Sequence, residues 1–377
     1  MARTSRTSPG KKGPCLTLLV CAAAIAGMLS GAEPGVEMVF ELPMAPAGLT
    51  VSPRGTFLLS ISHEDKPQSR VVEISKTGDS KPFPTDAISQ AAKDEPLVLD
   101  AVRGMTVDSY GIVWMLDNGH RSELPVKLVA WDYRHNKLHR VIHIVSPAVV
   151  PSSVPVDMAV DTDFPFVFIA DPANGTDAAM IVVDLTTGVS RRVLMGHPSV
   201  VPDAGLTLNI DGSKIESKRL DGSVADPIGG VTPIALDRKG EWLYFGPLRS
   251  RRLYRVRTEH LRNVALSADK LAGLVEQYSD KPICGGISLD NKGNVYVSDL
   301  AQKAIGIIPA ADKQYKILAS DPRFLWPDGL CFGPDGRLYF FTNSRRAQTT
   351  AAKRAHATPQ ANYLFKIQTP ASGRVGD

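Results

Sequence analysis

A pattern that occurs six times along the chain constrains its fold more than any other feature. Each copy has a small or turn residue, alternating apolar positions, a polar turn ending in glycine, and a second apolar stretch. Alternation with a period of two places every second side chain on the same face of a strand, so each copy predicts a β-hairpin. The six copies begin at Ala47, Arg103, Val156, Thr232, Gly285 and Asp328.

Each hairpin is followed by a third segment with the same alternation, and several of these continue through a turn into a fourth. The third segments are 71–74, 128–131, 180–185, 253–256, 304–308 and 363–367. A repeat of three to four strands is typical of a propeller blade, in which neighbouring sheets bury one another's faces. The sequence therefore predicts an all-β fold, a six-bladed β-propeller with four-stranded antiparallel blades.

The N-terminal segment has the features of an export signal. Basic residues precede an apolar run from Leu16 to Leu29, and small residues at 30–32 predict cleavage before Glu33. The run is shorter than the roughly 20 residues that span a bilayer as a helix. We therefore expect a signal peptide at 1–32, a single propeller domain at 33–377, a secreted or periplasmic location, and no membrane anchor in the mature form.

Charge and cysteine content narrow the function classes. The formal net charge is +4, part of it in the predicted signal peptide, and the basic clusters 249–252 and 345–354 fall in segments that resemble loops. Solvated charge is the usual role of such clusters, so no nucleic-acid partner is expected. Only Cys284 and Cys331 follow the signal peptide, and two thiols make no disulfide framework. We expect buried free thiols, with a bridge between them as the alternative.

Two segments interrupt the even spacing of the repeats. Residues 198–230 form an insertion rich in Pro, Gly and Asp, and residues 267–278 predict a helix that Ser267 could cap. Leu271, Leu274, Val275 and Tyr278 would form its apolar face. Loops on a rigid scaffold often carry function, so the insertion is a candidate functional segment.

The propeller geometry predicts where a site should lie. The first strand of each blade lines the axis, so residues before the first strands and after the second strands should meet at one mouth of the tunnel. The first group contains Arg103, Asp157, Thr232, Gly286 and Asp328, and the second contains 62–64, Asp117, Asn118, Asp171, Asp299 and 343–344. A separate set of aspartates in the hairpin turns is expected to cap backbone amides, namely Asp108, Asp161, Asp237, Asp290 and Asp335.

Several segments outside the generic blade pattern resemble the major royal jelly/yellow protein family. They include PLRSRRLYRV from Pro247, HPSV from His197, FIADPANG from Phe168, and WPDGL from Trp326 followed by FFTNSR from Phe340. The resemblance extends from Glu41 to Ile367. It implies a secreted six-bladed propeller, in a family with binders of small aromatic amines and proteins linked to dopachrome conversion. In the amine binders an Asn after the second strand of the last blade holds the ligand, and Asn343 matches that position.

We therefore expect a small-molecule ligand, aromatic or an amine, at the tunnel mouth, and dopachrome-type tautomerase activity as the candidate reaction. The expected ligand-binding residues are Asn343, Asn118, Trp326 and Arg103. Trp326 offers a ring for stacking, and Asp328 a carboxylate for an ammonium group. In a tautomerase, Asp328 or Asp157 would be the general base, and Asn343 or Arg103 would steady the developing oxyanion. No cofactor is required by this hypothesis.

Two alternatives come from other classes of protein. A metal-dependent lactonase, related to gluconolactonases, would hold Ca²⁺ or another divalent ion with oxygen ligands from Asp157, Asp328, Asn118 and Asn343. The chain also resembles the calcium-dependent lactonases in its PDGL strand start at 327–330, and that resemblance implies a Glu ligand from the first blade. The sequence at 46–48 is instead Pro-Ala-Gly. A protein-interaction scaffold would instead use the insertion 198–230 or the basic loop 344–362 as its contact surface.

Overall fold

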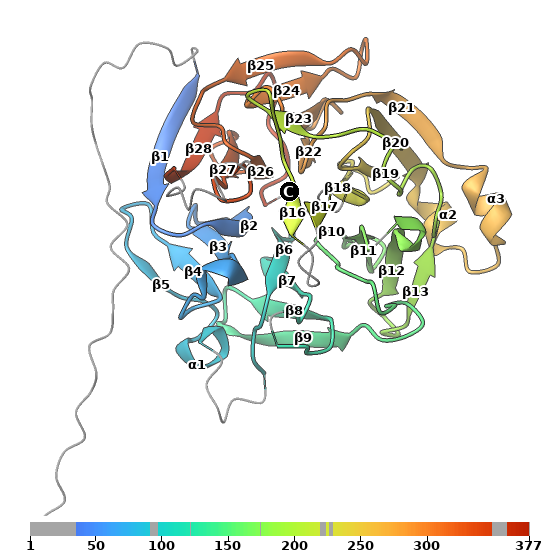
Figure 1. The fold of residues 1–377 in the computed structure, drawn as a ribbon. Coiled ribbons are helices and arrows are strands. Elements are labelled where there is room, and N and C mark those ends of the chain that lie inside the picture. The colour runs from blue at the N-terminus through green and yellow to red at the C-terminus, as the bar shows by residue number, and fades with distance from the viewer. Residues whose placement is uncertain are drawn as a thin grey trace, which may run out of the picture.

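Six four-stranded antiparallel sheets surround a central axis, which confirms the propeller fold predicted from the repeat (Figure 1). The computed structural model describes residues 35–90, 97–120, 122–173, 175–218, 224–225, 229–348 and 360–376. The predicted signal peptide, residues 1–32, lies outside the described residues. Within the described residues, no helix has the length and apolar character that crossing a bilayer requires.

The first three blades follow the chain without interruption. Blade 1 consists of β2 (Pro46–Val51), β3 (Phe57–Ile61), β4 (Val71–Ile74) and β5 (Ser80–Pro82). Blade 2 consists of β6 (Val102–Val107), β7 (Ile112–Asp117), β8 (Lys127–Asp132) and β9 (Lys137–His143). Blade 3 consists of β10 (Asp157–Asp161), β11 (Phe166–Asp171), β12 (Ala179–Asp184) and β13 (Ser190–Val193).

The other three blades complete the ring. Blade 4 consists of β18 (Val231–Leu236), β19 (Trp242–Pro247), β20 (Arg252–Arg257) and β21 (Glu276–Asp280). Blade 5 consists of β22 (Ile287–Leu289), β23 (Val295–Asp299), β24 (Ala304–Ile308) and β25 (Lys316–Ser320). Blade 6 consists of β26 (Pro327–Phe332), β27 (Leu338–Thr342), β28 (Asn362–Ile367) and β1 (Val36–Leu42). The six predicted third strands correspond to β4, β8, β12, β20, β24 and β28.

Strand β1 closes the ring by completing the last blade with a segment from the other end of the chain. It runs antiparallel to β28, with Val36 opposite Ile367 and Leu42 opposite Asn362. The repeat pattern did not predict this strand, because residues 36–42 lie before the first hairpin. The pairing protects the edge of β28 and ties residues 36–42 to the end of the blade array.

The hydrophobic core lies between neighbouring blades. One cluster joins Leu58 and Val71 of blade 1 to Val113 and Met115 of blade 2. Corresponding clusters lie between each of the other five pairs of adjacent blades. Because each sheet is covered on both faces, its strands are apolar on both faces and the whole ring shares one continuous core.

The turn aspartates cap backbone amides, as predicted. The Oδ1 atom of Asp290 accepts hydrogen bonds from the backbone N–H groups of Lys292 (2.8 Å) and Asn294 (3.0 Å), and its Oδ2 accepts one from the Tyr296 hydroxyl (2.8 Å). Asp108, Asp161, Asp237 and Asp335 accept backbone amides in the same way. These five carboxylates serve the hairpin turns on the face opposite the tunnel mouth.

The predicted helix at 267–278 is shorter than expected, and its second half was predicted wrongly. Helix α3 (Ala268–Ala272) begins as predicted, with Ser267 Oγ accepting a hydrogen bond from Lys270 N (3.4 Å). Tyr278, however, lies in β21, where pairing with β20 satisfies the backbone. The Tyr278 ring packs edge-on against Tyr244 with centroids 4.9 Å apart. Burial of this ring in a sheet outweighs the helical periodicity.

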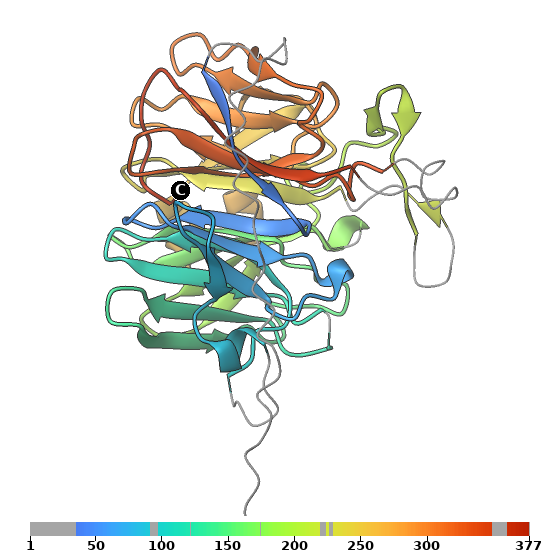
Figure 2. The same cartoon turned by 90° about the vertical axis from the view of Figure 1, so that its left-hand side faces the viewer.

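The remaining elements are short. They are α1 (Asp86–Ser89), α2 (Thr258–Arg262), two 3₁₀ turns at His63–Asp65 and Gly175–Asp177, and four two-residue strands of the insertion, β14 (Asn209–Ile210), β15 (Ser213–Lys214), β16 (Ser217–Lys218) and β17 (Val224–Ala225). Figure 2 shows the insertion projecting from one face of the ring, with the C-terminal end on the opposite face. Cys284 and Cys331 are buried free thiols.

Candidate functional site

The innermost strands are irregular where they begin, at the mouth of the tunnel. The pairing register shifts between Val102 and Met105 in β6 and between Asp328 and Cys331 in β26, and similar shifts occur in β2 and β18. A β-bulge bends a strand and redirects its side chains. The shifts therefore occur where Arg103 and Asp328 meet the axis.

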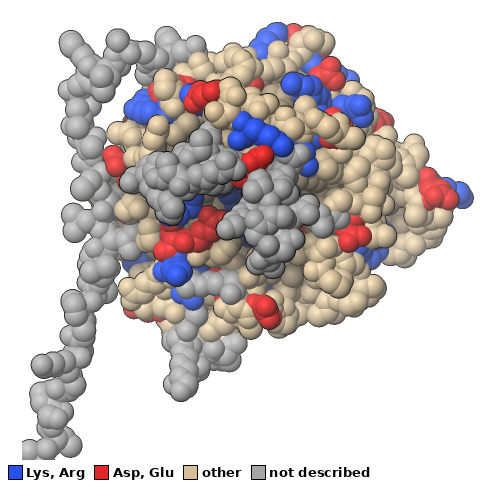
Figure 3. Space-filling model, viewed as in Figure 1, with Lys and Arg blue, Asp and Glu red and all other residues tan. Residues whose placement is uncertain are grey.

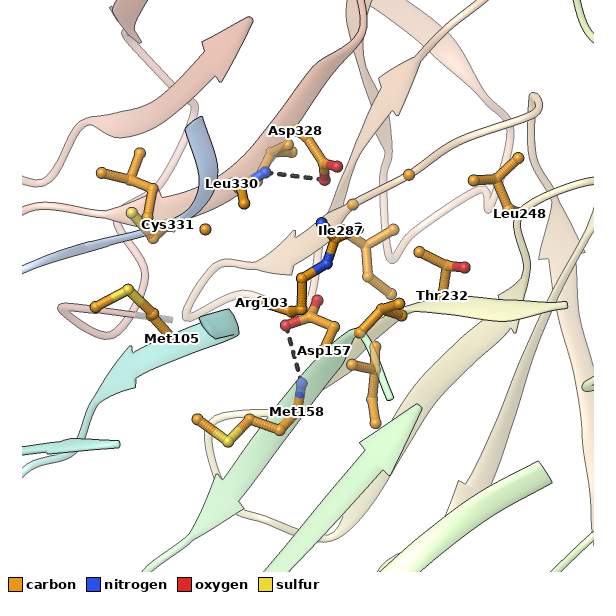
Figure 4. A pocket seen from close by; sticks show the side chains of 18 of the residues that line it. Arg103, Met105, Asp157, Met158, Thr232, Leu248, Ile287, Asp328, Leu330 and Cys331 are labelled. Atoms are coloured by element: carbon orange, nitrogen blue, oxygen red, sulfur yellow. Dashed lines mark hydrogen bonds between the residues drawn. The ribbon is translucent and has the colours of Figure 1, made fainter. Parts of the chain in front are cut away.

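A cavity of about 520 Å³ occupies this mouth, and side chains from several blades line it. The whole first group of the predicted ring contributes to its lining, together with one predicted aromatic: Arg103, Asp157, Thr232, Gly286, Asp328 and Trp326. Figure 4 shows Arg103 extending into the cavity, with Asp157 and Asp328 on either side. The volume is in the range of small-ligand sites.

Two glycines allow the carboxylates to lie against the neighbouring blades. A Cβ atom at Gly286 would lie 2.8 Å from Asp328 Oδ1, and one at Gly104 would lie 3.1 Å from Asp157 Oδ1. Any larger residue would displace these oxygens. The Asp328 and Asp157 carboxyls can approach the backbone this closely because Gly286 and Gly104 have no side chain.

Asp157 is held as a neutral acid near neutral pH. Its Oδ1 accepts a hydrogen bond from the Met158 amide at 2.9 Å. Burial raises the pKa of Asp157 to about 8. The hydrogen bond from the Met158 amide acts to lower this pKa, and the nearby Asp328 carboxylate acts to raise it further. Below that pH the carboxyl is protonated and can donate a hydrogen bond, so it suits the role of an acid better than the predicted role of a base.

Asp328 differs because cations face it. Its Oδ1 accepts a hydrogen bond from the Gly329 amide (3.0 Å), and its Oδ2 lies 3.4 Å from Arg346 Nη1. Burial raises the pKa of Asp328 above its ordinary value, and Arg346, the Gly329 amide and Arg103 oppose that rise without cancelling it. Of the two carboxyls, Asp328 is the one that cations face directly.

Arg103 is a half-buried cation without a direct partner. Burial, followed by repulsion from Arg346, lowers the pKa of Arg103 to about 9, which leaves the guanidinium charged at neutral pH. Glu64 and Asp328 attract it through space, but among the described residues it forms neither a hydrogen bond nor an ion pair. A guanidinium has five N–H donors, so this side chain has substantial unused hydrogen-bonding capacity.

Trp326 has two unusual features. Its φ angle is +50°, a left-handed conformation that is strained for an aromatic residue. The backbone N–H of Asn343 stabilises the turn by donating hydrogen bonds to Leu325 O at 2.9 Å and Trp326 O at 3.3 Å. The indole is 5% exposed, and its Nε1–H has no hydrogen-bond partner among the described residues. Strain and unpaired donors of this kind are concentrated at functional sites.

Asn118 and Asn343 lie outside the described lining of the cavity and join adjacent blades. Asn118 Nδ2 donates to Pro155 O (3.2 Å), and Asn343 Nδ2 donates to Pro46 O (2.9 Å). Their Oδ1 atoms accept backbone amides from His120 and Arg346. Both ends of each amide are thus occupied, and the predicted contact of these residues with a ligand stays a prediction.

The carboxylates that follow the second strands are also structural. Asp117 accepts the backbone amides of Asp100 (2.8 Å) and Ala101 (2.9 Å) and pairs with Lys127 at 2.8 Å. Asp171 and Asp299 bind loop amides in equivalent places. Of this second predicted group, only Glu64 lines the cavity in the described part of the chain.

The four oxygen ligands proposed for a divalent ion are only partly brought together. Asp157 and Asp328 line the cavity, whereas Asn118 and Asn343 are bound to the backbone of neighbouring blades. Across the residues that the structure describes, no group of three or more His, Cys, Asp or Glu side chains is placed to hold a metal ion.

Sequence reasoning assigned no ligand role to two arginines at the mouth. Arg345 forms an ion pair with Asp65, which also accepts the Ala45 amide, and Arg346 faces Asp328. Both line the cavity. Their position after β27, immediately beyond Asn343, was the available signal. Seen along the axis, acidic and basic side chains lie close together near the centre of this face (Figure 3).

The insertion contributes to the mouth as well. Ile215 and Glu216 line the cavity, and Ile215 belongs to an apolar cluster with Leu248 and Trp326. This cluster joins the insertion to blades 4, 5 and 6. Lys303 Nζ adds an ion pair to Asp211 at 2.7 Å. The insertion is therefore anchored beside the cavity, and its functional role stays a prediction.

The other end of the tunnel is closed by residues 372–376. The Gly376 carbonyl accepts hydrogen bonds from Thr50 Oγ1 (3.1 Å) and Thr106 Oγ1 (3.0 Å), and its amide donates to Phe332 O (2.8 Å). Gly376 also lines the cavity. The cavity is consequently a pocket with a floor made by this segment.

Comparison with a family sequence profile identifies one match. The profile described as major royal jelly protein matches residues 101–358, which is more than half of the chain. No curated protein sequence matches the chain significantly.

Solved structures share the architecture at low sequence identity. A calcium-binding protein, regucalcin, from Agrobacterium tumefaciens is 15% identical, with 91% of this chain and 96% of that chain covered and a TM-score of 0.56. A gluconolactonase from Xanthomonas campestris is 12% identical, with coverage of 97% and 100% and a TM-score of 0.53. A luciferin-regenerating enzyme is 10% identical, with coverage of 92% and 98% and a TM-score of 0.55. Identities this low show a common fold alone.

Proposed function

The chain belongs to the major royal jelly protein family, and we propose that it is an exported protein that binds a small aromatic or amine ligand in the cavity at the tunnel mouth. The observation that carries the proposal is Arg103, a guanidinium that lines the cavity with neither a hydrogen bond nor an ion pair among the described residues. Trp326, in the same wall, adds a buried indole N–H without a partner among those residues. Buried donors without partners are costly in a finished structure, so a ligand that accepts their hydrogen bonds explains them.

The shape and composition of the cavity support an aromatic ligand. Apolar side chains such as Leu248, Ile287 and Leu330 line it beside Trp326, while the charged groups are confined to a few positions. Small-molecule sites combine an apolar wall, which contributes most of the affinity, with a few polar groups that set orientation. An aromatic ring against the apolar wall with its polar substituent toward Arg103 uses both.

The same residues support tautomerase chemistry as a finer proposal. A tautomerase removes a proton from one atom of its substrate and delivers a proton to another, with no net change in composition. Asp328, whose surroundings include two arginines, is the base that takes the first proton, and Asp157, protonated below about pH 8, is the acid that supplies the second. Arg103 stabilises negative charge that develops on a substrate oxygen.

Isothermal titration calorimetry on residues 33–377 tests the binding proposal. Tyramine, dopamine, serotonin and hydroxylated aromatic acids form the ligand set, and Trp326→Phe and Asp328→Asn are the cavity variants. Trp242→Phe and Asp312→Asn are matched controls, because Trp242 stacks against Arg255 and the exposed Asp312 pairs with Lys316, neither of them part of the described cavity lining. We expect saturable binding that the cavity variants weaken and the controls leave unchanged.

Two outcomes would contradict the proposal. Absence of binding by every aromatic ligand would favour the scaffold alternative. A Ca²⁺ titration that gives tight binding lost in Asp157→Asn and Asp328→Asn, with no response to aromatic ligands, would favour the metal-dependent hydrolase. Export is tested separately by expressing the full chain and measuring the mass of the mature N-terminus, for which we expect cleavage before Glu33.

A further inference from the structure

We propose that the ligand of this cavity carries a carboxylate, which Arg103 binds, so that the preferred ligand is an aromatic acid or amino acid and not a simple amine. This inference rests on the proposed binding function and narrows its ligand class. It follows from two donors that have no direct partner among the described residues, the Arg103 guanidinium and the Trp326 indole N–H.

Two of the three arginines at the mouth face a carboxylate directly, and the third does not. Arg345 is neutralised by Asp65, and Arg346 faces Asp328 at 3.4 Å. Arg103 remains as the guanidinium with neither hydrogen bond nor ion pair among the described residues. Glu64 and Asp328 attract this guanidinium through space without contacting it, so its N–H donors stay free, and a ligand carboxylate could accept hydrogen bonds from them.

The neutral polar groups point to the same ligand chemistry. The Trp326 Nε1–H is a buried donor without an acceptor in the described residues, and the indole can only donate. Figure 4 shows Asp157 beside Arg103. When it is protonated, Asp157 adds an O–H donor at this place. An ammonium group has three donors and no acceptor, so it could satisfy none of these groups. A carboxylate has two acceptor oxygens and could satisfy several.

Arg103 also has the geometry that carboxylate recognition needs. Arg103 lies near the start of β6, the innermost strand of blade 2, at the register shift next to Gly104. Its side chain reaches the cavity from there. The guanidinium fork matches the two oxygens of a carboxylate, and such charge-assisted pairs are stronger than neutral hydrogen bonds. Glu64, which attracts Arg103 through space, also lines the cavity and could accept the ammonium group of an amino acid.

A series of four ligands with the same phenol ring tests the proposal on the unmodified protein. The series is 3-(4-hydroxyphenyl)propanoate, tyrosine, tyramine and 4-ethylphenol, each titrated calorimetrically at pH 7. It varies the carboxylate and the ammonium independently. We expect the acid and the amino acid to bind about tenfold or more tightly than tyramine and 4-ethylphenol. Comparison of the acid with tyrosine then shows whether the site prefers a free acid or an amino acid.

Arg103 variants locate the effect. Arg103→Gln should weaken binding of the two carboxylate ligands about tenfold or more and leave 4-ethylphenol unchanged, and Arg103→Lys should keep part of the affinity. Arg337→Gln is the control, because Arg337 pairs with Glu37 and does not contribute to the described cavity lining. Circular dichroism and thermal unfolding of each variant establish that the fold is intact.

The possible failures are distinguishable. If tyramine binds as tightly as the acid, or if Arg103→Gln leaves the affinity for the acid unchanged, the carboxylate inference is wrong while the proposed binding function stands. If none of the four ligands binds but dopamine or serotonin does, the inference is wrong and the proposed function stands. If no aromatic ligand of either set binds, both are wrong. The ligand series alone decides the question even if every Arg103 variant fails to fold.

Discussion

Asn343 on blade 6 donates a hydrogen bond of 2.9 Å from its Nδ2 to the carbonyl of Pro46 on blade 1. This bond crosses the junction at which the ring closes, where β1 completes blade 6. Asn118 makes the same kind of bond from blade 2 to Pro155, just before blade 3. The repetition shows that this amide joins successive blades.

Asn343→Ala should therefore destabilise the fold. The variant leaves the buried Pro46 carbonyl and the Arg346 amide without their partner, which costs about 1–3 kcal/mol of unfolding free energy. Urea unfolding followed by tryptophan fluorescence measures it, with the exposed Asn209→Ala as control. A variant that is as stable as the wild type but has lost ligand affinity would show that Asn343 acts on the ligand directly and not through the blade junction.

Trp326→Phe and Trp114→Phe should have different effects on stability. The Trp114 Nε1–H donates to Asp108 Oδ2 at 2.8 Å, so Trp114→Phe removes a buried hydrogen bond to a charged group and costs about 1–3 kcal/mol. Trp326→Phe removes a donor that has no partner among the described residues, so ligand-free stability should fall less. Thermal and urea unfolding of both variants, with and without ligand, make the comparison. Equal losses in the absence of ligand would contradict this account of Trp326.

Asp157 should make stability depend on pH in a defined direction. Its pKa in the folded protein, about 8, is raised above the ordinary aspartate value of 3.8, so the folded state holds the proton more tightly than the unfolded state. This contribution is complete below pH 3.8 and is lost as the pH rises toward 8. Unfolding free energies from pH 5 to pH 9 should therefore decline for the wild type.

Asp157→Asn removes the titrating group and should flatten that decline. The variant keeps the charged groups that face Asp157, namely Asp328, Arg103, Arg346 and Glu64. Measuring the unfolding free energy against pH for both proteins therefore isolates the effect of Asp157. Parallel curves for the wild type and Asp157→Asn between pH 5 and pH 8 would mean that the carboxyl is ionised in the folded protein at neutral pH.

Removal of residues 371–377 should open the floor of the cavity. The truncation removes the Gly376 carbonyl that binds Thr50 and Thr106. Loss of these buried hydrogen bonds should lower the melting temperature, and exposure of the tunnel interior should increase binding of the dye 8-anilinonaphthalene-1-sulfonate.

Gly376→Ala tests the same floor with a single substitution. A Cβ at this position would lie 2.2 Å from Val107 Cγ1, and the φ of +91° is unfavourable for alanine, so the segment should be displaced. Gly212→Ala is the control, since its φ is also positive but no atom lies within 4 Å of an added Cβ. Dye binding that is no higher for Gly376→Ala than for Gly212→Ala would contradict closure of the tunnel by this segment.

The sequence by itself was sufficient for the features that arise from neighbouring residues. Period-two alternation defines a hairpin within some fifteen residues, and an aspartate such as Asp290 binds amides two and four residues ahead. Six such units can bury their faces only against one another, so the propeller follows from local patterns. The ring of first-strand residues, including Arg103, Asp157 and Asp328, could be placed for the same reason.

The tertiary structure decided what depends on residues far apart in the chain. No local pattern shows that 36–42 pairs with β28 or that Gly376 binds Thr50, 326 residues away. Tyr278 joined a strand because β20 offered a partner edge, and Asn343 bonds to Pro46 because ring closure brings blade 1 beside it. Likewise, the tertiary structure places Asp65 and Asp328 beside Arg345 and Arg346, and leaves Arg103 without a direct partner among the described residues. Charge pairing and burial depend on three-dimensional proximity, which sequence periodicity does not specify.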